Sequence, residues 1–194
     1  KYCDVSRPKK DIYTQEHRNT ARKIAAESFV LLKNDDNTLP LKNKKTIAIV
    51  GPLADTRSNM PGTWSVAVDL NKPATMVEGI KSVAGKNVNV LYAKGSNLTS
   101  DPILEQNSTV FGRSLNREHR TEEELRQEAL NIAAKADVII TAMGEASEMS
   151  GESSSRADIG IPDVQQRLLK ELLQTAKPVV LGLFTGPPIT LVGE

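Results

Sequence analysis

The sequence lacks the features that would mark a disulfide-rich, membrane-spanning or nucleic-acid-binding protein. Its one cysteine, Cys3, excludes an internal disulfide framework and any site built from several thiolates. No apolar run reaches the roughly 18 residues that a membrane-spanning helix requires. The 25 basic and 24 acidic side chains nearly cancel, which argues against nucleic acid or an anionic membrane as a partner. We therefore expect an uncharged or small partner.

Histidine is also scarce, and this excludes further kinds of site. His17 and His119 have no second histidine or thiol at ligand spacing, so the sequence predicts neither a metal site nor a cofactor. No G-x-S-x-G elbow is present, so a Ser-His-Asp hydrolase is not supported. The opening "KYCDVSRPKK" is too charged for a signal peptide and lacks an initiator methionine. We expect the chain to be cut from a longer precursor.

What the sequence does contain is an alternation of short aliphatic runs and amphipathic segments. The aliphatic runs predict parallel strands buried on both faces, at 44–52, 87–95, 136–144 and 178–184. The amphipathic segments predict crossover helices at 74–85, 121–136 and 163–176, the second opening with a Thr121-x-x-Glu124 capping box. With 194 residues, one globular core is expected. The pattern predicts the α/β class, as a three-layer α/β/α sandwich with a mainly parallel sheet.

Two further segments lie outside this alternation. Residues 14–34 have apolar side chains at helical spacing up to Leu31 and Leu32, and Thr14 is placed to cap the start. They predict one long amphipathic helix. Residues 96–120 are rich in asparagine, serine and charge, which predicts an excursion over the surface.

Two loops after the first predicted strand have alternative interpretations. The stretch "GPLAD" (51–55) could direct backbone N–H groups at an anion, but it lacks a dinucleotide glycine fingerprint and contains a proline, so a plain turn is favoured. The stretch "PGTWSVA" (61–67) holds the only tryptophan, Trp64. Its indole could fill the core or stack on the apolar face of a sugar ring, and the residues alone leave both open.

The densest group of polar residues follows the third predicted strand. Residues 141–162, "TAMGEASEMSGESSSRADIGIP", hold Glu145, Glu148, Glu152 and Arg156. Loops at the carboxyl ends of parallel strands are where α/β proteins usually bind ligands. On composition alone, a solvated acidic turn is the simpler interpretation.

Several stretches resemble, in order, the second domain of glycoside hydrolase family 3, nearest its bacterial periplasmic β-glucosidase type. They are "ARKIAAESFVLLKNDDNTLPL" (21–41), "TIAIVGPLAD" (46–55), "GTWSVA" (62–67), "VLYAKGSNLTSD" (90–101) and "GEASEMSGESSSRADIGIP" (144–162). In that family an N-terminal (β/α)8 barrel carries the aspartate nucleophile and an α/β sandwich domain follows. The resemblance implies that residues 1–194 are this sandwich without its barrel, with a sheet incomplete on its C-terminal side, from a periplasmic or secreted protein.

The resemblance also implies roles for single residues. The family's general acid/base glutamate, often followed four positions later by arginine, corresponds to Glu152 and Arg156. Trp64 corresponds to the tryptophan on the aglycone side of the pocket, and Glu145 matches a family position suited to supporting the loop. The resemblance thus gives Glu152 as the expected catalytic residue and Trp64, Glu145 and Arg156 as the expected substrate-binding residues. Glu148 is the weakest candidate of the three glutamates. The family's Asn-Gly-Arg-Pro turn is Thr-Gly-Pro-Pro at 185–188, so its arginine is absent here.

Together these implications predict part of a retaining β-glycosidase, with β-glucosidase as the first choice. Such an enzyme needs a nucleophilic carboxylate and, about 5 to 5.5 Å away, a second carboxyl as acid and base. The expected partners are a β-linked oligosaccharide or glucoside and the barrel of the same polypeptide, and the chain alone is expected to be inactive. The alternative is a non-catalytic carbohydrate-binding or protein-interaction module that docks through its sheet edge or the Trp64 loop. A phosphate- or nucleotide-binding flavodoxin-like domain, based on "GPLAD" alone, ranks last.

Overall fold

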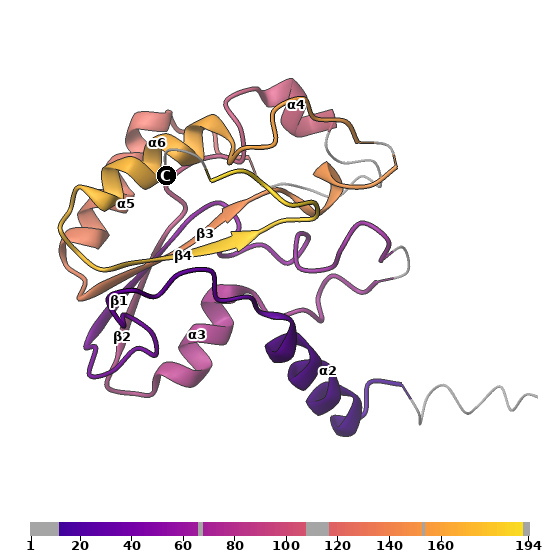
Figure 1. The fold of residues 1–194 in the computed structure, drawn as a ribbon, viewed down its shortest axis with the longest axis horizontal. Coiled ribbons are helices and arrows are strands. Elements are labelled where there is room, and N and C mark those ends of the chain that lie inside the picture. The colour runs from indigo at the N-terminus through magenta and orange to yellow at the C-terminus, as the bar shows by residue number, and fades with distance from the viewer. Residues whose placement is uncertain (1–11, 66–67, 108–116, 153, 192–194) are drawn as a thin grey trace, which may run out of the picture. The chain divides into compact units, whose positions relative to one another are not determined.

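The computed structural model describes residues 12–65, 68–107, 117–152 and 154–191 (Figure 1). It divides the chain into two compact units, Lys1–Pro40 and Leu41–Glu194. The first unit contains helix α2, Gln15–Ser28. The Thr14 hydroxyl accepts a hydrogen bond from the backbone N–H of His17 at 3.2 Å, which confirms the predicted cap.

The predicted continuation of this helix to Leu32 is wrong. Helix α2 ends at Ser28, and Phe29 is extended at φ −69° and ψ 134°. The Ser28 hydroxyl donates to the carbonyls of Ile24 and Ala25, each at 2.9 Å. Such back-bonding weakens the last turn of a helix. The aromatic and β-branched side chains that follow Ser28 favour extended backbone over helix.

The second unit is organised around a parallel sheet, as predicted. Its strands are β1 (Thr46–Val50), β2 (Asn89–Ala93), β3 (Val138–Gly144) and β4 (Val179–Phe184). Among the described residues they form one sheet in the order β2-β1-β3-β4, and every pairing is parallel. The two central strands, β1 and β3, therefore have adjacent carboxyl ends.

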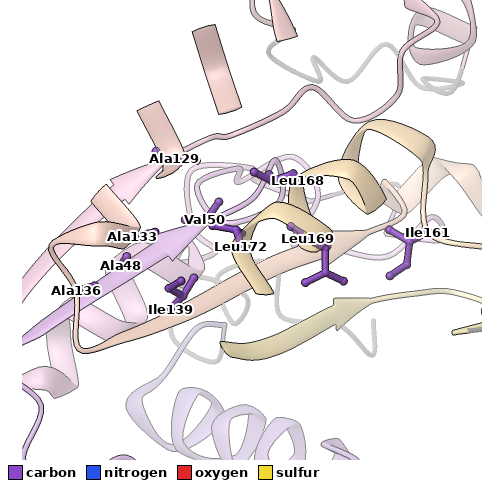
Figure 2. Packing of buried hydrophobic residues seen from close by; sticks show 12 residues of the cluster. Ala48, Val50, Ala129, Ala133, Ala136, Ile139, Ile161, Leu168, Leu169 and Leu172 are labelled. Carbon is purple, nitrogen blue, oxygen red and sulfur yellow. The ribbon is translucent and has the colours of Figure 1, made fainter. Parts of the chain in front are cut away.

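Helices cover both faces of this sheet (Figure 1). Helix α3 (Met76–Ala84) lies on one face, and α5 (Glu122–Ala134) and α6 (Asp163–Leu173) lie on the other. Successive residues of a strand point to opposite faces, so β1 contributes to two cores. Ile47 and Ile49 pack in the core that includes Val77 of α3. The other core joins β1 and β3 to α5 and α6 through the residues labelled in Figure 2: Ala48, Val50, Ala129, Ala133, Ala136, Ile139, Ile161, Leu168, Leu169 and Leu172. The predicted α/β/α sandwich is confirmed.

Capping boxes start two of these helices. In α5 the Thr121 hydroxyl accepts from the Glu124 N–H at 3.2 Å, and the Glu124 carboxylate accepts from the Thr121 N–H at 2.8 Å, as predicted. The hydrogen bond from the Thr121 backbone holds the pKa of Glu124 below its usual value. Helix α3 has the same arrangement with Thr75 and Glu78, which the sequence analysis did not recognise.

The prediction that residues 96–120 run over the surface is right for 100–104 and 119–120, which are exposed, and wrong for 96–99 and 105, which are buried. Asn97, Leu98 and Glu105 are buried, and Pro102–Asn107 form helix α4, while 108–116 lie outside the described residues. The Asn97 side chain accepts from the Glu118 N–H at 2.8 Å and donates to the Glu118 carbonyl at 3.1 Å. Glu105 pairs with Arg117. Asn97 can be buried because its amide is paired with the Glu118 backbone, and the charge of Glu105 is compensated by Arg117.

Candidate active site

The turn after β1 is used to pack the sheet. Gly51 has φ +134°, and a Cβ there would lie 2.2 Å from the Ala142 carbonyl oxygen of β3, so only glycine fits. The Leu53 N–H donates to that carbonyl at 3.3 Å, and the Ala54 N–H donates to the Gly51 carbonyl at 3.2 Å. Because these donors are engaged within the chain, the plain-turn interpretation of "GPLAD" is supported over anion binding.

The end of β3 is held as tightly against β4. Gly144 has φ +126°, and a Cβ there would lie 2.1 Å from the Phe184 carbonyl oxygen. That oxygen accepts a hydrogen bond from the Glu145 N–H at 2.8 Å. The polar loop therefore leaves the sheet from a fixed point.

The first glutamate of the loop is buried and paired. The Glu145 side chain is 2 % exposed, and its Oε1 forms an ion pair with Nη1 of Arg156. Its Oε2 accepts from the Gly186 N–H at 3.3 Å, from the turn after β4. The Nη2 of Arg156 donates to the Gly160 carbonyl at 2.9 Å. The Glu145–Arg156 pair thus joins the start of the loop to its end and to the turn after β4.

The other two glutamates differ from Glu145 and from each other. Glu148 is buried within the short 3-10 helix η1, Ser147–Met149, and the Ser154 hydroxyl donates to its carbonyl at 2.6 Å. Glu152 is exposed and follows Gly151, whose φ is +131°. Of the three glutamates, only Glu152 presents its carboxylate to solvent. A uniformly solvated acidic turn is therefore excluded.

Thr63 connects this loop to the loop that carries Trp64. Its Oγ1 is hydrogen-bonded to the Ser147 carbonyl and lies 2.5 Å from the Ser150 carbonyl. A Cβ on Gly151 would lie 2.8 Å from the Thr63 methyl carbon, so the Gly151 backbone lies close against the Thr63 side chain. Trp64 is 66 % exposed, which excludes the core-filling interpretation of its indole. Trp64 and Glu152 each adjoin one member of this Thr63–Gly151 contact, so the structure brings their loops together.

Three residues that hold these loops were missed from the sequence: Thr63, Gly186, and Gln165, whose buried amide is hydrogen-bonded to the Gly144 backbone. Thr63 and Gly186 act through contacts with distant segments, and nothing in their local sequence indicates this. The sequence around Gln165, in contrast, does carry a recognisable signal. Gln165 falls on the buried stripe of α6, and all its buried neighbours there are aliphatic: Val164, Leu168, Leu169 and Leu172. A polar residue on an apolar stripe indicates a buried hydrogen-bonding role.

Other features of the described residues do not add to this site. A hollow of about 460 Å³ is lined by Asp55, Arg57, Ser58, Leu70, Asn71, Thr75 and Glu78, and it includes neither Trp64 nor Glu152. Its arginine already pairs with Glu78. In the part of the chain that the structure describes, no three His, Cys, Asp or Glu side chains gather to hold a metal, and no helix is long and apolar enough to cross a membrane.

Comparison with known sequences decides the family. Residues 29–194 match the glycosyl hydrolase family 3 C-terminal domain. The chain belongs to this family. It is 42 % identical over 178 residues to the periplasmic beta-glucosidase of Salmonella typhimurium, a match that covers 92 % of this chain and 23 % of the relative. It is 31 % identical over 175 residues to the thermostable beta-glucosidase B of Acetivibrio thermocellus, covering 90 % of this chain and 21 % of the relative.

Solved structures agree with this assignment. The beta-glucosidase of Listeria innocua in complex with isofagomine superposes with a TM-score of 0.75 at 31 % identity, covering 97 % of this chain and 22 % of that one. A beta-glucosidase involved in saponin metabolism from intestinal bacteria gives a TM-score of 0.77 at 26 % identity, covering 97 % and 27 %. The chain thus spans between 21 and 27 % of the length of these family 3 relatives. The extent of the domain, 1–194, stays a prediction, because the family match begins at residue 29.

Proposed function

We propose that this family 3 domain supplies the general acid/base and part of the aglycone site of a retaining β-glycosidase, with β-glucosidase as the first choice. The observation that carries the proposal is the difference in burial among the loop's glutamates: Glu145 and Glu148 are buried, whereas Glu152 is exposed and follows Gly151, which lies against Thr63. The names of the relatives support the reaction class, since those reported above are β-glucosidases.

The proposed chemistry divides between this chain and a barrel outside it. A barrel aspartate attacks the anomeric carbon while Glu152 gives its proton to the leaving oxygen, and Glu152 then takes a proton from water as the glycosyl-enzyme is hydrolysed. A general acid has to carry its proton before the bond breaks. Burial of the carboxyl beneath a bound sugar and the approach of the aspartate both favour the protonated form.

Within this scheme Glu145 and Arg156 position the loop. Their charged groups are already engaged with each other, with Gly186 and with Gly160, and they are mostly removed from solvent. We therefore infer that Glu145 and Arg156 contribute to substrate binding indirectly, by holding Glu152 in position. Trp64 is the candidate for direct contact with the aglycone, because its exposed indole can stack on a sugar or aryl ring.

The proposed substrate is a β-linked glucoside or oligosaccharide, and the proposed partner is a (β/α)8 barrel of the same polypeptide that holds the nucleophile and the cleaved sugar. The Salmonella relative is named as periplasmic, which supports export to the periplasm or secretion. Residues 1–194 alone should not hydrolyse an aryl β-glucoside, which a direct assay of the purified fragment checks.

The central test replaces the proposed acid/base in the full-length enzyme. Glu152→Gln should slow hydrolysis of natural glucosides by roughly 10²- to 10⁴-fold, the usual contribution of general acid–base catalysis. Substrates with good leaving groups need little protonation, so glycosyl-enzyme should accumulate with them. Azide attacks without a general base, so it should restore turnover and give a glycosyl azide of retained configuration.

The matched control is Glu145→Gln, the same change at the buried glutamate of the same loop. It should give no azide rescue, because a positioning residue affects geometry and not one proton transfer. If azide rescues the Glu145 variant and not the Glu152 variant, the acid/base is assigned to the wrong residue.

A further inference from the structure

We propose that Gln165 is a positioning residue for the general acid/base, and that its buried amide sets the point from which the Glu152 loop leaves the sheet. The inference rests on the proposed role of Glu152. Gln165 lies in the first turn of α6, and its side chain is fully buried. The proposed role is indirect, because it does not depend on contact between Gln165 and either Glu152 or the substrate.

The Gln165 amide binds three backbone groups from two other segments. Its Oε1 accepts from the Gly144 N–H at 2.8 Å, and its Nε2 donates to the Gly144 carbonyl at 3.0 Å. The same Nε2 donates to the Leu98 carbonyl at 2.8 Å, in the segment that follows β2. All three partners are backbone groups, so the amide fixes the path of the main chain.

The position of Gly144 links this contact to the catalytic loop. Gly144 is the last residue of β3, and its positive φ turns the chain from the sheet into the loop. Helix α6 begins at Asp163, directly after that loop. Gln165 therefore joins the two ends of the loop, as the Glu145–Arg156 pair also does through different contacts. A displacement at Gly144 would be passed to both Glu145 and Glu152.

The chemistry of the amide explains why glutamine occupies this place. Gly144 offers one donor and one acceptor, and Leu98 offers a second acceptor. A neutral side chain with one acceptor and two donors satisfies all three. Aliphatic replacement leaves three buried backbone groups unpaired, and an ionised carboxylate faces two carbonyl oxygens without a donor.

The test uses two variants of the full-length enzyme with its barrel. Gln165→Met keeps the length and approximate volume of the side chain but removes every hydrogen bond. Gln165→Glu keeps the acceptor, and when it is protonated it can donate to one carbonyl. A carboxyl buried among carbonyl oxygens holds its proton to a higher pH than an exposed one, so this variant should be most like the original enzyme at low pH.

The decisive readout is the dependence on leaving group, because a loss of stability alone does not change it. Rates for an alkyl glucoside should fall in Gln165→Met by on the order of tenfold more than rates for 2,4-dinitrophenyl glucoside, a weaker form of the effect of removing the acid itself. In Gln165→Glu the alkyl-glucoside rate should decline at lower pH than in the original enzyme. The same pH change should affect the dinitrophenyl rate less.

The matched control is Asp137, which directly precedes β3 and so lies at the opposite end of that strand from Gly144. Asp137 also binds backbone groups, the N–H groups of Lys45 and Thr46 at 2.8 and 2.9 Å, at the amino end of the strands. Asp137→Ala should lower stability without changing the ratio of the two rates. An unchanged ratio in folded Gln165→Met, or an unshifted pH profile in Gln165→Glu if the methionine variant does not fold, would overturn the inference.

The proposed function is tested separately by Glu152→Gln. Azide rescue in that variant together with an unchanged ratio at Gln165 rejects the positioning role alone. Absence of rescue at Glu152 rejects the proposed acid/base itself.

Discussion

At the scale of single residues, burial distinguishes side chains that composition treats alike. Glu145, Glu148 and Glu152 lie within eight positions of one another, yet only the last is exposed. Glu145 instead forms an ion pair with Arg156. Removing one member of a buried ion pair is costly because the other charge stays behind without compensation.

This cost can be measured at Glu145. Glu145→Gln in the full-length protein should destabilise it by about 2–4 kcal/mol, somewhat less than the usual cost of about 3–5 kcal/mol for a broken buried pair, because Arg156 is partly exposed. Thermal unfolding followed by circular dichroism measures the change. The double variant Glu145→Gln with Arg156→Met should recover part of the loss, since no charge is then left unpaired. Additive losses would show that the pair is not coupled.

Asp137 gives a prediction for pH. Hydrogen bonds from the backbone of Thr46 and Lys45 hold the pKa of its carboxyl below the ordinary value of 3.8. A lowered folded-state pKa means that the carboxylate stabilises the fold above the unfolded-state pKa, and that this contribution disappears as pH falls through the folded-state pKa. In Asp137→Ala the acid limb of the stability curve should be shallower below about pH 4. Unfolding midpoints of both proteins from pH 7 to 2 check this, and equal slopes would contradict it.

At the scale of elements, the loops after β1 and β3 support one another through a single hydroxyl. Thr63→Val removes the Oγ1 that is bonded to the carbonyls of Ser147 and Ser150 but keeps the shape of the side chain. We expect the hydrogen bonds of the Glu152 loop to lose about 0.5–1.5 kcal/mol of stabilisation, with little effect on the rest of the domain. Hydrogen exchange of the full-length protein should be faster in 145–156 and unchanged in α5. Thr63→Ser, which keeps the hydroxyl, is the control and should resemble the original protein.

The elements themselves could be predicted from the sequence because their causes are local. Continuous aliphatic runs predicted the four strands that the described residues form, and the Thr121 and Glu124 spacing predicted a capping box that the structure contains. The end of α2 was mispredicted because helical spacing of Leu31 and Leu32 continued past Ser28, where the backbone becomes extended. Periodicity alone does not register a competing side-chain hydrogen bond.

The contacts that build the site could not be predicted in the same way. Thr63 binds carbonyls 84 and 87 positions away, and Gln165 binds Leu98 across 67 positions. No local pattern encodes such partners, because they depend on which strands become neighbours. The family resemblance indicated Glu152 and Trp64, but the pairing of Glu145 with Arg156 came from the structure.

At the scale of the whole molecule, strand order explains why distant segments share one site. The order β2-β1-β3-β4 places β3 between β1 and β4, and all strands point the same way. The loop after β3 is therefore flanked by the Thr63 segment after β1 and the Gly186 turn after β4. The Asn-Gly-Arg-Pro arginine is absent at 185–188, but the backbone N–H of Gly186 still contacts Glu145. The support of the loop thus does not depend on that arginine.

The division of the proposed site between two domains gives a prediction for substrate preference in the full-length enzyme. The barrel is expected to hold the cleaved sugar, and Trp64 of this chain, 66 % exposed, is expected to stack on the leaving group. An aromatic contact contributes about 0.5–1.5 kcal/mol beyond area burial, or roughly 2- to 12-fold in kcat/KM at about 1.4 kcal/mol per tenfold. Trp64→Ala should therefore lower kcat/KM by that factor for cellobiose and aryl glucosides and leave methyl glucoside, whose aglycone is too small to stack, nearly unchanged. Trp64→Phe should retain most of the preference because it keeps an aromatic face. An equal loss for all three substrates would place the indole against the cleaved sugar, or remove it from the pocket, and would contradict the aglycone assignment.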